Sequence, residues 1–516
     1  MKLFDLLARF VRTKAYAART RYGETQNSRR LTVPTATATR AQGQPAPSTR
    51  DPLDAEPPLA DPSFPRLEVV KDPELMREVF QRHLQPLDGK TYQVLDCRIH
   101  YIHYRRAARC VVQYTLRLAE PETGREWSQW VSGVLYANGR TQRIWEKLQR
   151  TESEQRESEE RGVSDSSPAF APFSYLPDLD MLMQVFPYDH RFPALRLLMS
   201  GPPPDLEPLL LARFGTGDWR AEAWNVEPVR YRVDMRAALR LTLRARDTVT
   251  GRVEQRRFYA KIYRKEEEGE RTYRVLRALC NKIGEGDAGF TVAKPVAYLS
   301  ELRTLLQEEV TGTSLEDILC REEDEAIQAM RKAARALASL HLGDDVVASG
   351  HRSLQDEVSA LEGVGKLLQQ ACPQLGQEIE EAVGAVVAGL EEVPSAPIHG
   401  DLKPAHIIVD GDSVALIDLD KFAMADPVVD VANLLFLLPS GSSQHHLPNG
   451  RVAQAFVEEY FARVPEAWRA RLPLHYAAAL LKKAAYGFHR RQASGGPERV
   501  EAMVERAKDS LAGKIW

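Results

Sequence analysis

The hydrophobic positions of this chain separate a strand-rich region from a helical one. Between about 66 and 315, short apolar runs alternate with polar residues and are divided by turn-forming residues, which predicts antiparallel strands. From about 316 onward, apolar residues recur at helical spacing and predict helices over 327–340, 361–390, 452–464, 474–488 and 500–511. The pattern predicts an α+β protein whose sheets precede a helical region.

An internal repeat organises the strand-rich region. Residues 104–119 resemble residues 231–246 at an offset of 127 positions, and Val134-Leu135-Tyr136 matches Lys261-Ile262-Tyr263 at the same offset. Residues 175–184 resemble residues 298–307 at an offset of 123, so only the length of a loop differs. Each copy reads as three strands, a charged helix (141–150 or 269–279) and two further strands. We interpret the acidic stretch 152–160 as a solvated loop of the first copy.

The first 65 residues have a different character. Leu3, Leu6, Leu7 and Phe10 share one face of a short helix followed by basic residues, so docking to a partner or an anionic membrane surface and packing on the protein itself are both open. Residues 27–65 are rich in proline, threonine and alanine and predict a linker. The expected organisation is a helix and linker over 1–65, a first repeat over 66–200, a second over 201–312 and a helical region over 313–516.

Composition excludes several classes of protein. With 516 residues the chain is expected to form several globular units, and its net charge of −3 gives no electrostatic reason to expect nucleic acid as a partner. The five cysteines lie far apart and contain no CxxC pair, which argues against a structural zinc site. No apolar run reaches the roughly 18 residues of a transmembrane helix, and no signal peptide is recognised. We therefore expect a cytoplasmic protein.

Candidate chemistry is concentrated between 398 and 432. Asp401 lies in the loop His399-Gly400-Asp401-Leu402-Lys403-Pro404, where a carboxylate can accept the proton of a hydroxyl group. Lys403 is two residues further along an extended loop and is expected to point the same way, toward a transferred phosphate. Phosphoryl transfer needs such a base together with cations that neutralise the phosphates.

A hairpin should bring metal ligands to this loop. Asp410-Gly411-Asp412 predicts a turn between 407–409 and 414–417, which delivers Asp418 beside the loop. Asp418 is the preferred Mg²⁺ ligand because hard cations favour carboxylate oxygen, and His406 is expected as a second ligand. Asp420 is predicted to assist because alternate residues of a strand share a face.

These motifs resemble the aminoglycoside phosphotransferase family, relatives of choline and homoserine kinases. The family pattern is HGD followed by Asn, then Ile-Asp, then Asp-Pro-x-x-Asp, which is similar here to 399–406, Ile417-Asp418 and 426–432. Leu340-His341 and the segment 306–315 also resemble family segments. The resemblance implies a bilobal protein-kinase-like fold, and it makes the first repeat an extra, degenerate copy of the β-rich small lobe.

The resemblance also implies roles for individual residues. Asp401 would be the catalytic base, Asp418 the Mg²⁺ ligand and Lys261 the third-strand lysine on the ATP phosphates. Backbone groups of Glu308 and Val310 would contact adenine. The glutamate that pairs with the lysine is expected at Glu270, although strict helix spacing places Thr272 there.

The sequence departs from the family pattern at several points. His406 replaces the usual asparagine, and no glycine-rich loop separates the first two strands around Tyr231–Arg236. The first repeat has Val134 where the second has Lys261, so it cannot hold phosphate in the same way.

The predicted activity is ATP- and Mg²⁺-dependent phosphorylation of a small-molecule hydroxyl. Residues 316–393 contain 16 acidic and 6 basic residues, a balance of −10 that would suit a cationic acceptor such as an aminoglycoside or amino-alcohol. Solvated helix faces explain the same charges, so sugars and other hydroxylated acceptors remain open. A pseudokinase scaffold and a protein kinase are the alternatives.

Overall fold

The computed structural model describes residues 61–514, except 106–107, 160–168, 202, 204, 285–288, 344–349, 439–449 and 491–495. The predicted N-terminal helix, and nearly all of the predicted linker, lie outside the described residues. The chain divides into two units, residues 1–196 and 197–516, which are described separately below. Within the described part of the chain, no helix is both long and apolar enough to cross a membrane.

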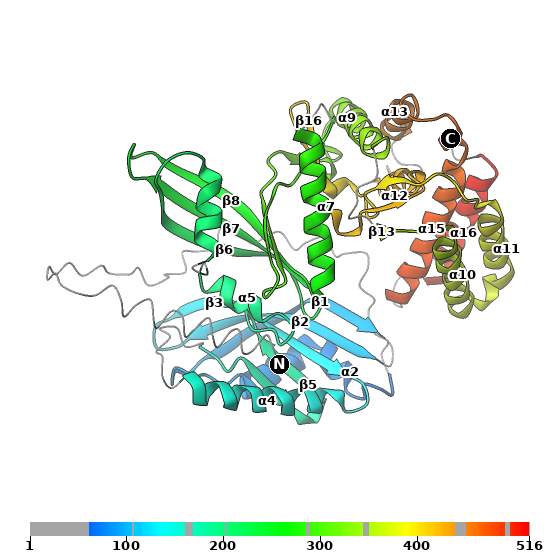
Figure 1. Ribbon diagram of the computed structural model, residues 1–516. Coiled ribbons are helices and arrows are strands. Elements are labelled where there is room, and N and C mark those ends of the chain that lie inside the picture. Colours follow the sequence, from blue (N-terminus) through cyan, green and yellow to red (C-terminus); the bar gives the residue numbers. More distant parts are fainter. Residues whose placement is uncertain are drawn as a thin grey trace. The chain divides into compact units, whose positions relative to one another are not determined.

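The first unit is a five-stranded antiparallel sheet with helices (Figure 1). Its core places Met76 and Phe80 of the second helix against Tyr114 of the sheet, whose hydroxyl donates to Val70 O at 2.6 Å. The elements are α2 (Leu67–Lys71), α3 (Pro73–His83), β1 (Gln93–Arg105), β2 (Arg109–Glu120), β3 (Arg125–Tyr136), α4 (Arg140–Glu159), β4 (Phe173–Leu176) and β5 (Met181–Val185). The prediction that 152–160 is a loop was wrong, because α4 continues through Glu159.

The second unit begins with another five-stranded antiparallel sheet. Before it lie α5 (Pro193–Met199), which spans the division between the units, and α6 (Leu206–Leu211). The strands are β6 (Trp219–Arg232), β7 (Arg236–Asp247), β8 (Val253–Ile262), β10 (Pro295–Leu299) and β11 (Thr304–Glu308), and α7 (Glu266–Gly284) follows β8. Tyr263, the residue after β8, and Leu305 of β11 belong to the apolar core that continues into the helical region.

The two sheets share strand order and hydrogen-bond register. The order is β1-β2-β3-β5-β4 in the first and β6-β7-β8-β11-β10 in the second. Cys110 pairs with Leu135 as Ala237 pairs with Ile262, and Val134 pairs with Leu182 as Lys261 pairs with Leu305. A bulge between Val94 and Asp96 recurs between Ala221 and Ala223. The offsets of 127 and 123 seen in the sequence therefore correspond to the same positions in the two sheets.

The remainder of the second unit is mainly helical. Its helices are α8 (Leu315–Ile318), α9 (Glu323–His341), α10 (Leu354–Ala371), α11 (Gly376–Gly389), α12 (Val428–Phe436), α13 (Gly450–Phe461), α14 (Ala467–Ala470), α15 (Leu472–Arg490) and α16 (Gly496–Leu511). The single helix predicted over 361–390 is two helices, because Pro373 begins a short 3₁₀ turn between them. The other long predicted helices are confirmed.

Short strands carry the loops of interest. β15 (Ile407–Asp410) and β16 (Ser413–Leu416) form the predicted hairpin, with Asp410 paired to Ser413, and β12 (Thr313–Ser314) and β9 (Thr291–Val292) complete that sheet. A second small sheet joins β13 (Gly350–His351), β17 (Ala423–Ala425) and β14 (Ala396–Ile398).

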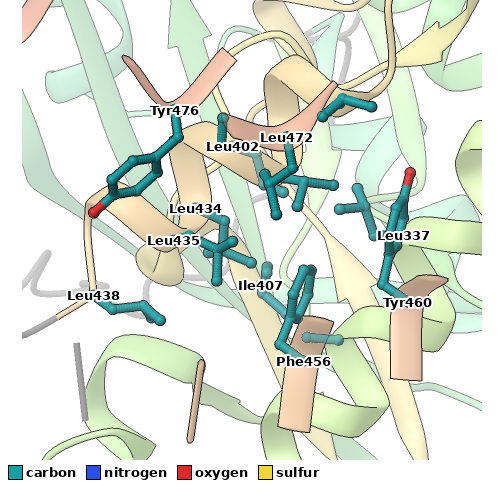
Figure 2. Packing of buried hydrophobic residues seen from close by; sticks show 14 of the residues in the cluster. Leu337, Leu402, Ile407, Leu434, Leu435, Leu438, Phe456, Tyr460, Leu472 and Tyr476 are labelled. Atoms are coloured by element: carbon teal, nitrogen blue, oxygen red, sulfur yellow. The ribbon is translucent and has the colours of Figure 1, made fainter. Parts of the chain in front are cut away.

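A continuous apolar core lies beneath these loops. Figure 2 shows Leu402 and Ile407 among Leu434, Leu435 and Phe456, which come from α12 and α13. Leu402 is 1% exposed and Ile407 is fully buried. Apolar side chains on both sides of the loop 403–406 thus fix its two ends to the helical core.

Candidate active site

The loop that carries Asp401 leaves β14 through a glycine that no other residue could replace without strain. Gly400 has φ +76°, and a Cβ atom there would stand 2.2 Å from the backbone oxygen of Lys421. A φ angle in this range favours glycine, and the close backbone approach excludes a side chain. The glycine of the HGD motif therefore allows the loop to pass directly against the chain that follows Asp418.

A buried carboxylate holds the start of this loop. Asp430 on α12 is fully buried and accepts hydrogen bonds from the backbone N–H of His399 at 2.5 Å and of Gly400 at 3.0 Å. His341 Nε2 lies 3.4 Å from the same carboxylate. Burial alone would raise the pKa of Asp430, but hydrogen bonds with His341 and the backbone of His399 outweigh it and lower the pKa. Asp430 is therefore a charged acceptor that positions the loop.

Positive charge surrounds the Asp401 carboxylate. Lys421 Nζ lies 3.5 Å from one carboxylate oxygen and Lys403 Nζ 3.8 Å from the other. Arg352 donates to the backbone oxygens of Lys421 at 3.0 Å and Gly400 at 3.4 Å. The Asp401 side chain is 37% exposed, so a ligand in solvent can reach it. Lysines beside a carboxylate also neutralise an incoming phosphate.

Asp418 occupies an unusual backbone conformation. Its φ is +64°, in the left-handed region, and the 3₁₀ turn Leu419–Lys421 follows directly. Non-glycine residues in this region are uncommon and concentrate at functional sites. Asp420 was predicted on a strand face shared with Asp418, and this prediction was wrong, because the strand ends at Leu416 and the chain turns.

Lys261 nevertheless joins both aspartates. Its ammonium lies 2.5 Å from Asp418 Oδ1 and 3.3 Å from Asp420 Oδ1, and the Tyr263 hydroxyl donates to Asp420 Oδ1 at 2.8 Å. Burial would lower the pKa of Lys261, but the charges of Asp420 and Asp418 raise it, so the lysine stays protonated. For Asp418, burial is outweighed by Lys261 and His406, and its pKa is well below the usual range. Lys261 and Asp418 therefore face each other as a charged pair.

The structure does not bring Glu270 to Lys261. The Glu270 carboxylate is 51% exposed and lies 3.9 Å from Arg274, one turn along α7. Instead, Arg271 Nη2 of α7 donates to the backbone oxygen of Asp420 at 3.3 Å. Thr272, the position that strict helix spacing indicated, is buried and donates to Glu268 O. The helix therefore contacts the cluster through an arginine rather than through a glutamate.

The predicted adenine-contacting residues lie at the end of β11. The N–H of Glu308 already donates to Lys294 O at 2.8 Å, so a contact from Glu308 to adenine would use its carbonyl oxygen. The Glu308 carboxylate forms an ion pair with Arg213 at 2.5 Å, and Arg213 precedes the first strand of this sheet. Val310 follows in the segment that leads to β12. Glu308 is the last residue of β11 and lies three positions after Leu305, which pairs with Lys261, and Val310 lies two residues further on.

A second acidic anchor lies at the start of α12. Asp426 accepts from Arg471 Nε at 2.7 Å and from His475 Nε2 at 2.9 Å, both from the C-terminal helices. Burial would raise the pKa of Asp426, but His475 and Arg471 lower it strongly. The two aspartates of the Asp-Pro-x-x-Asp motif therefore have structural roles: Asp426 holds the C-terminal helices and Asp430 holds the Asp401 loop.

Three side chains form a set of potential metal ligands. One ligand atom each of Asp401, His406 and Asp418 lies within 4.8 Å of the others. His406 Nε2 is 3.2 Å from Asp418 Oδ2, and the histidine side chain is 7% exposed. Two carboxylates and an imidazole suit a divalent cation in donor type and charge. The geometry therefore fits a divalent ion at the position that the sequence indicated.

Several contributing residues were not singled out from the sequence. Tyr263, Arg271, Lys421 and Arg352 contact the cluster or its backbone. Their contacts join segments far apart in sequence, and only Tyr263, two residues after Lys261 and directly after the end of β8, carries a local signal.

Comparison with known proteins places the site in a family context. Residues 244–474 match the model of the phosphotransferase enzyme family. Among solved structures, a thermostable mutant of an aminoglycoside phosphotransferase is 15% identical, covering 60% of this chain and 98% of that one with a TM-score of 0.40. The macrolide 2′-phosphotransferase of Brachybacterium faecium is 19% identical, covering 58% and 96% with a TM-score of 0.37. No match to a curated protein sequence is found.

A choline/ethanolamine kinase family protein of Mesorhizobium loti is 16% identical, covering 53% of this chain and 88% of that one with a TM-score of 0.36. The family match itself begins within β7 and ends within α15, so it includes Lys261, Asp401, Asp418 and Asp430. The resemblance predicted from the sequence is confirmed: residues 244–474 of this chain have the sequence characteristics of the phosphotransferase enzyme family.

Proposed function

We propose that this protein is a phosphotransferase that moves the terminal phosphoryl group of ATP to a hydroxyl of a small molecule. The observation that carries the proposal is the convergence of Lys261, Asp418 and Asp401 from three separate segments. Lys261 comes from β8, Asp418 from the turn after β16 and Asp401 from the loop after β14. Each supplies one of the groups that phosphoryl transfer requires: a cation, a metal-binding carboxylate and a base.

Each residue has a distinct part in the proposed reaction. Asp401 orients the acceptor hydroxyl and accepts its proton, while Lys403 and Lys421, within 4 Å of that carboxylate, neutralise charge on the transferred group. Asp418, with His406, would hold a Mg²⁺ ion that neutralises charge on the nucleotide phosphates, and Asp420 would support Lys261 on the nucleotide. The carbonyl of Glu308 and a backbone group of Val310 contact adenine.

The acceptor is a hydroxylated small molecule: an aminoglycoside, an amino-alcohol or a sugar. The lysines beside Asp401 favour a sugar over a polycationic acceptor, because a cationic group would be repelled at the point of transfer. The first unit, with Val134 at the position of Lys261, is proposed as a degenerate small lobe without phosphate-binding capacity. We also propose a cytoplasmic location, where ATP is available.

The test is ATP binding and turnover with wild type and Asp401→Asn. Calorimetry with ATP and Mg²⁺ measures nucleotide binding, and release of ADP is followed across a panel of aminoglycosides, amino-alcohols, sugars and nucleosides. Wild type should bind ATP and turn over at least one acceptor class. The variant should bind ATP with similar affinity and lose about 10³-fold or more in turnover, as expected for loss of a general base with its electrostatic role.

A scaffold protein with vestigial nucleotide binding is the second candidate. It is favoured by the engagement of Lys261 with two carboxylates and by the imidazole of His406 where the family has an amide. Wild type that binds ATP but transfers phosphate to no acceptor in the panel would favour the scaffold. Wild type that fails to bind ATP would reject the kinase proposal outright.

A further inference from the structure

Both ring nitrogens of His406 face oxygen atoms that only accept hydrogen bonds. Nδ1 lies 3.1 Å from the backbone oxygen of Asp401, and a carbonyl oxygen only accepts hydrogen bonds. Nδ1 therefore carries the proton. In the neutral imidazole the other nitrogen, Nε2, then presents a lone pair. A histidine whose Nδ1–H is held by a carbonyl oxygen has the arrangement typical of a metal ligand.

The lone pair of Nε2 faces another electron-rich atom. Asp418 Oδ2 lies 3.2 Å away, and the second oxygen of that carboxylate is already bound to Lys261. A nitrogen lone pair and a carboxylate oxygen at this distance need a positive charge between them, which either a second ring proton or a divalent ion bound to both atoms supplies. Neighbouring ligands of a small divalent ion, with bonds of about 2.1 Å, stand about 3 Å apart. An oxygen of Asp401 completes the set, because one ligand atom from each of the three residues lies within 4.8 Å of the other two.

We propose that this site selects Mn²⁺, Co²⁺ or another borderline divalent ion over Mg²⁺, and that His406 is the residue that sets the preference. Mg²⁺ is a hard ion that favours oxygen ligands, whereas imidazole nitrogen raises the affinity for first-row transition ions. The role of the ion in phosphoryl transfer rests on the proposed function. Binding of the ion does not depend on that function.

The test measures metal binding by the full-length protein without nucleotide. After treatment with a chelator, Mn²⁺ binding is measured by electron paramagnetic resonance with Mg²⁺ as competitor, for wild type and His406→Asn. The exposed His83 provides a matched control, because His83→Asn removes an imidazole that lies far from His406 in the sequence. We expect the ratio of Mn²⁺ to Mg²⁺ affinity to fall at least about tenfold in His406→Asn, as for loss of a ligand, and to stay at the wild-type value in His83→Asn.

An equal ratio in wild type and His406→Asn would overturn the proposal. A second measurement needs no variant: the Co²⁺-loaded wild type should show a paramagnetically shifted, solvent-exchangeable imidazole N–H proton, and its absence would also overturn the proposal. Phosphate transfer is assayed separately. Absent transfer with the ratio change intact rejects the proposed function alone, whereas active transfer with no ratio change rejects this inference alone.

Discussion

Replacing Asp430 by asparagine tests whether the Asp401 loop is held by one buried carboxylate. The carboxylate accepts from two consecutive backbone N–H groups, of His399 and Gly400. The asparagine side chain has the same shape but a single acceptor oxygen. Its NH₂ group would face a backbone donor, so one of the two N–H groups would lose its partner in a fully buried position.

The cost follows from the bonds that are lost. A hydrogen bond to a charged acceptor contributes about 1.5–3 kcal/mol, and a buried donor left without a partner costs about 1–3 kcal/mol. These terms overlap, so we expect the loop to open more easily by about 2–4 kcal/mol. At about 1.4 kcal/mol for each factor of ten, its opening equilibrium should rise by a factor of about 30 to 1,000.

Hydrogen exchange measured by mass spectrometry reports this opening without knowledge of the acceptor. Peptides covering 396–402 should exchange faster by that factor in Asp430→Asn, while peptides of β2 in the first unit should be unchanged. The control is Asp412→Asn, which changes a fully exposed aspartate at the hairpin turn. Exchange at 396–402 as slow in Asp430→Asn as in wild type would refute the assigned role of Asp430.

Three further predictions concern the same region. Lys261→Met should abolish detectable ATP binding by calorimetry, because it removes the ammonium group held at 2.5 Å from Asp418; an unchanged Kd would remove Lys261 from the nucleotide site. Gly400→Ala should lower Tm by several degrees, because its Cβ would stand 2.2 Å from a backbone oxygen, whereas Gly384→Ala, with no atom within 4 Å, should not; equal Tm values would contradict the close approach. Asp426 has a lowered pKa, so its stabilisation, about 3 kcal/mol for a buried paired carboxylate, is present above about pH 4 and is lost as the pH falls through the folded-state value. Urea unfolding of wild type and Asp426→Asn should therefore differ most above about pH 4, and the difference should shrink as the pH falls from 4 to 2. A pH-independent difference would show that the charge of Asp426 is not involved.

The sequence was most informative where local pattern and chemistry coincide. Lys261 could be placed because its strand neighbours are apolar, and Asp401 and Asp418 because a short hairpin with a two-residue turn connects their loops. The repeat could be aligned residue by residue because the sheets keep one register.

Predictions failed where backbone conformation or tertiary contacts decide. Asp420 was predicted on a strand, but Asp418 has a left-handed backbone conformation, which a strand does not allow. The residue types in this segment do not predict that conformation. Glu270 was expected to pair with Lys261, although helix spacing favoured Thr272, yet Arg271 is the residue of α7 that reaches the cluster. Asp430 was recognised as part of a motif, but its hydrogen bonds to His399 and Gly400 depend on how α12 packs.

The shared register of the two sheets also bears on how this chain folds. During synthesis and refolding, β2 offers β8 nearly the same backbone pattern that β7 does, so strands of one unit can pair wrongly with those of the other, a known hazard of repeated domains. Backbone hydrogen bonds alone would not distinguish the pairings. Discrimination must come from residues that differ at corresponding positions: Gly133 leaves space for Met181 in the first sheet, and the first sheet has Val134 where the second has Lys261. Divergence between the copies is thus expected to disfavour strand exchange.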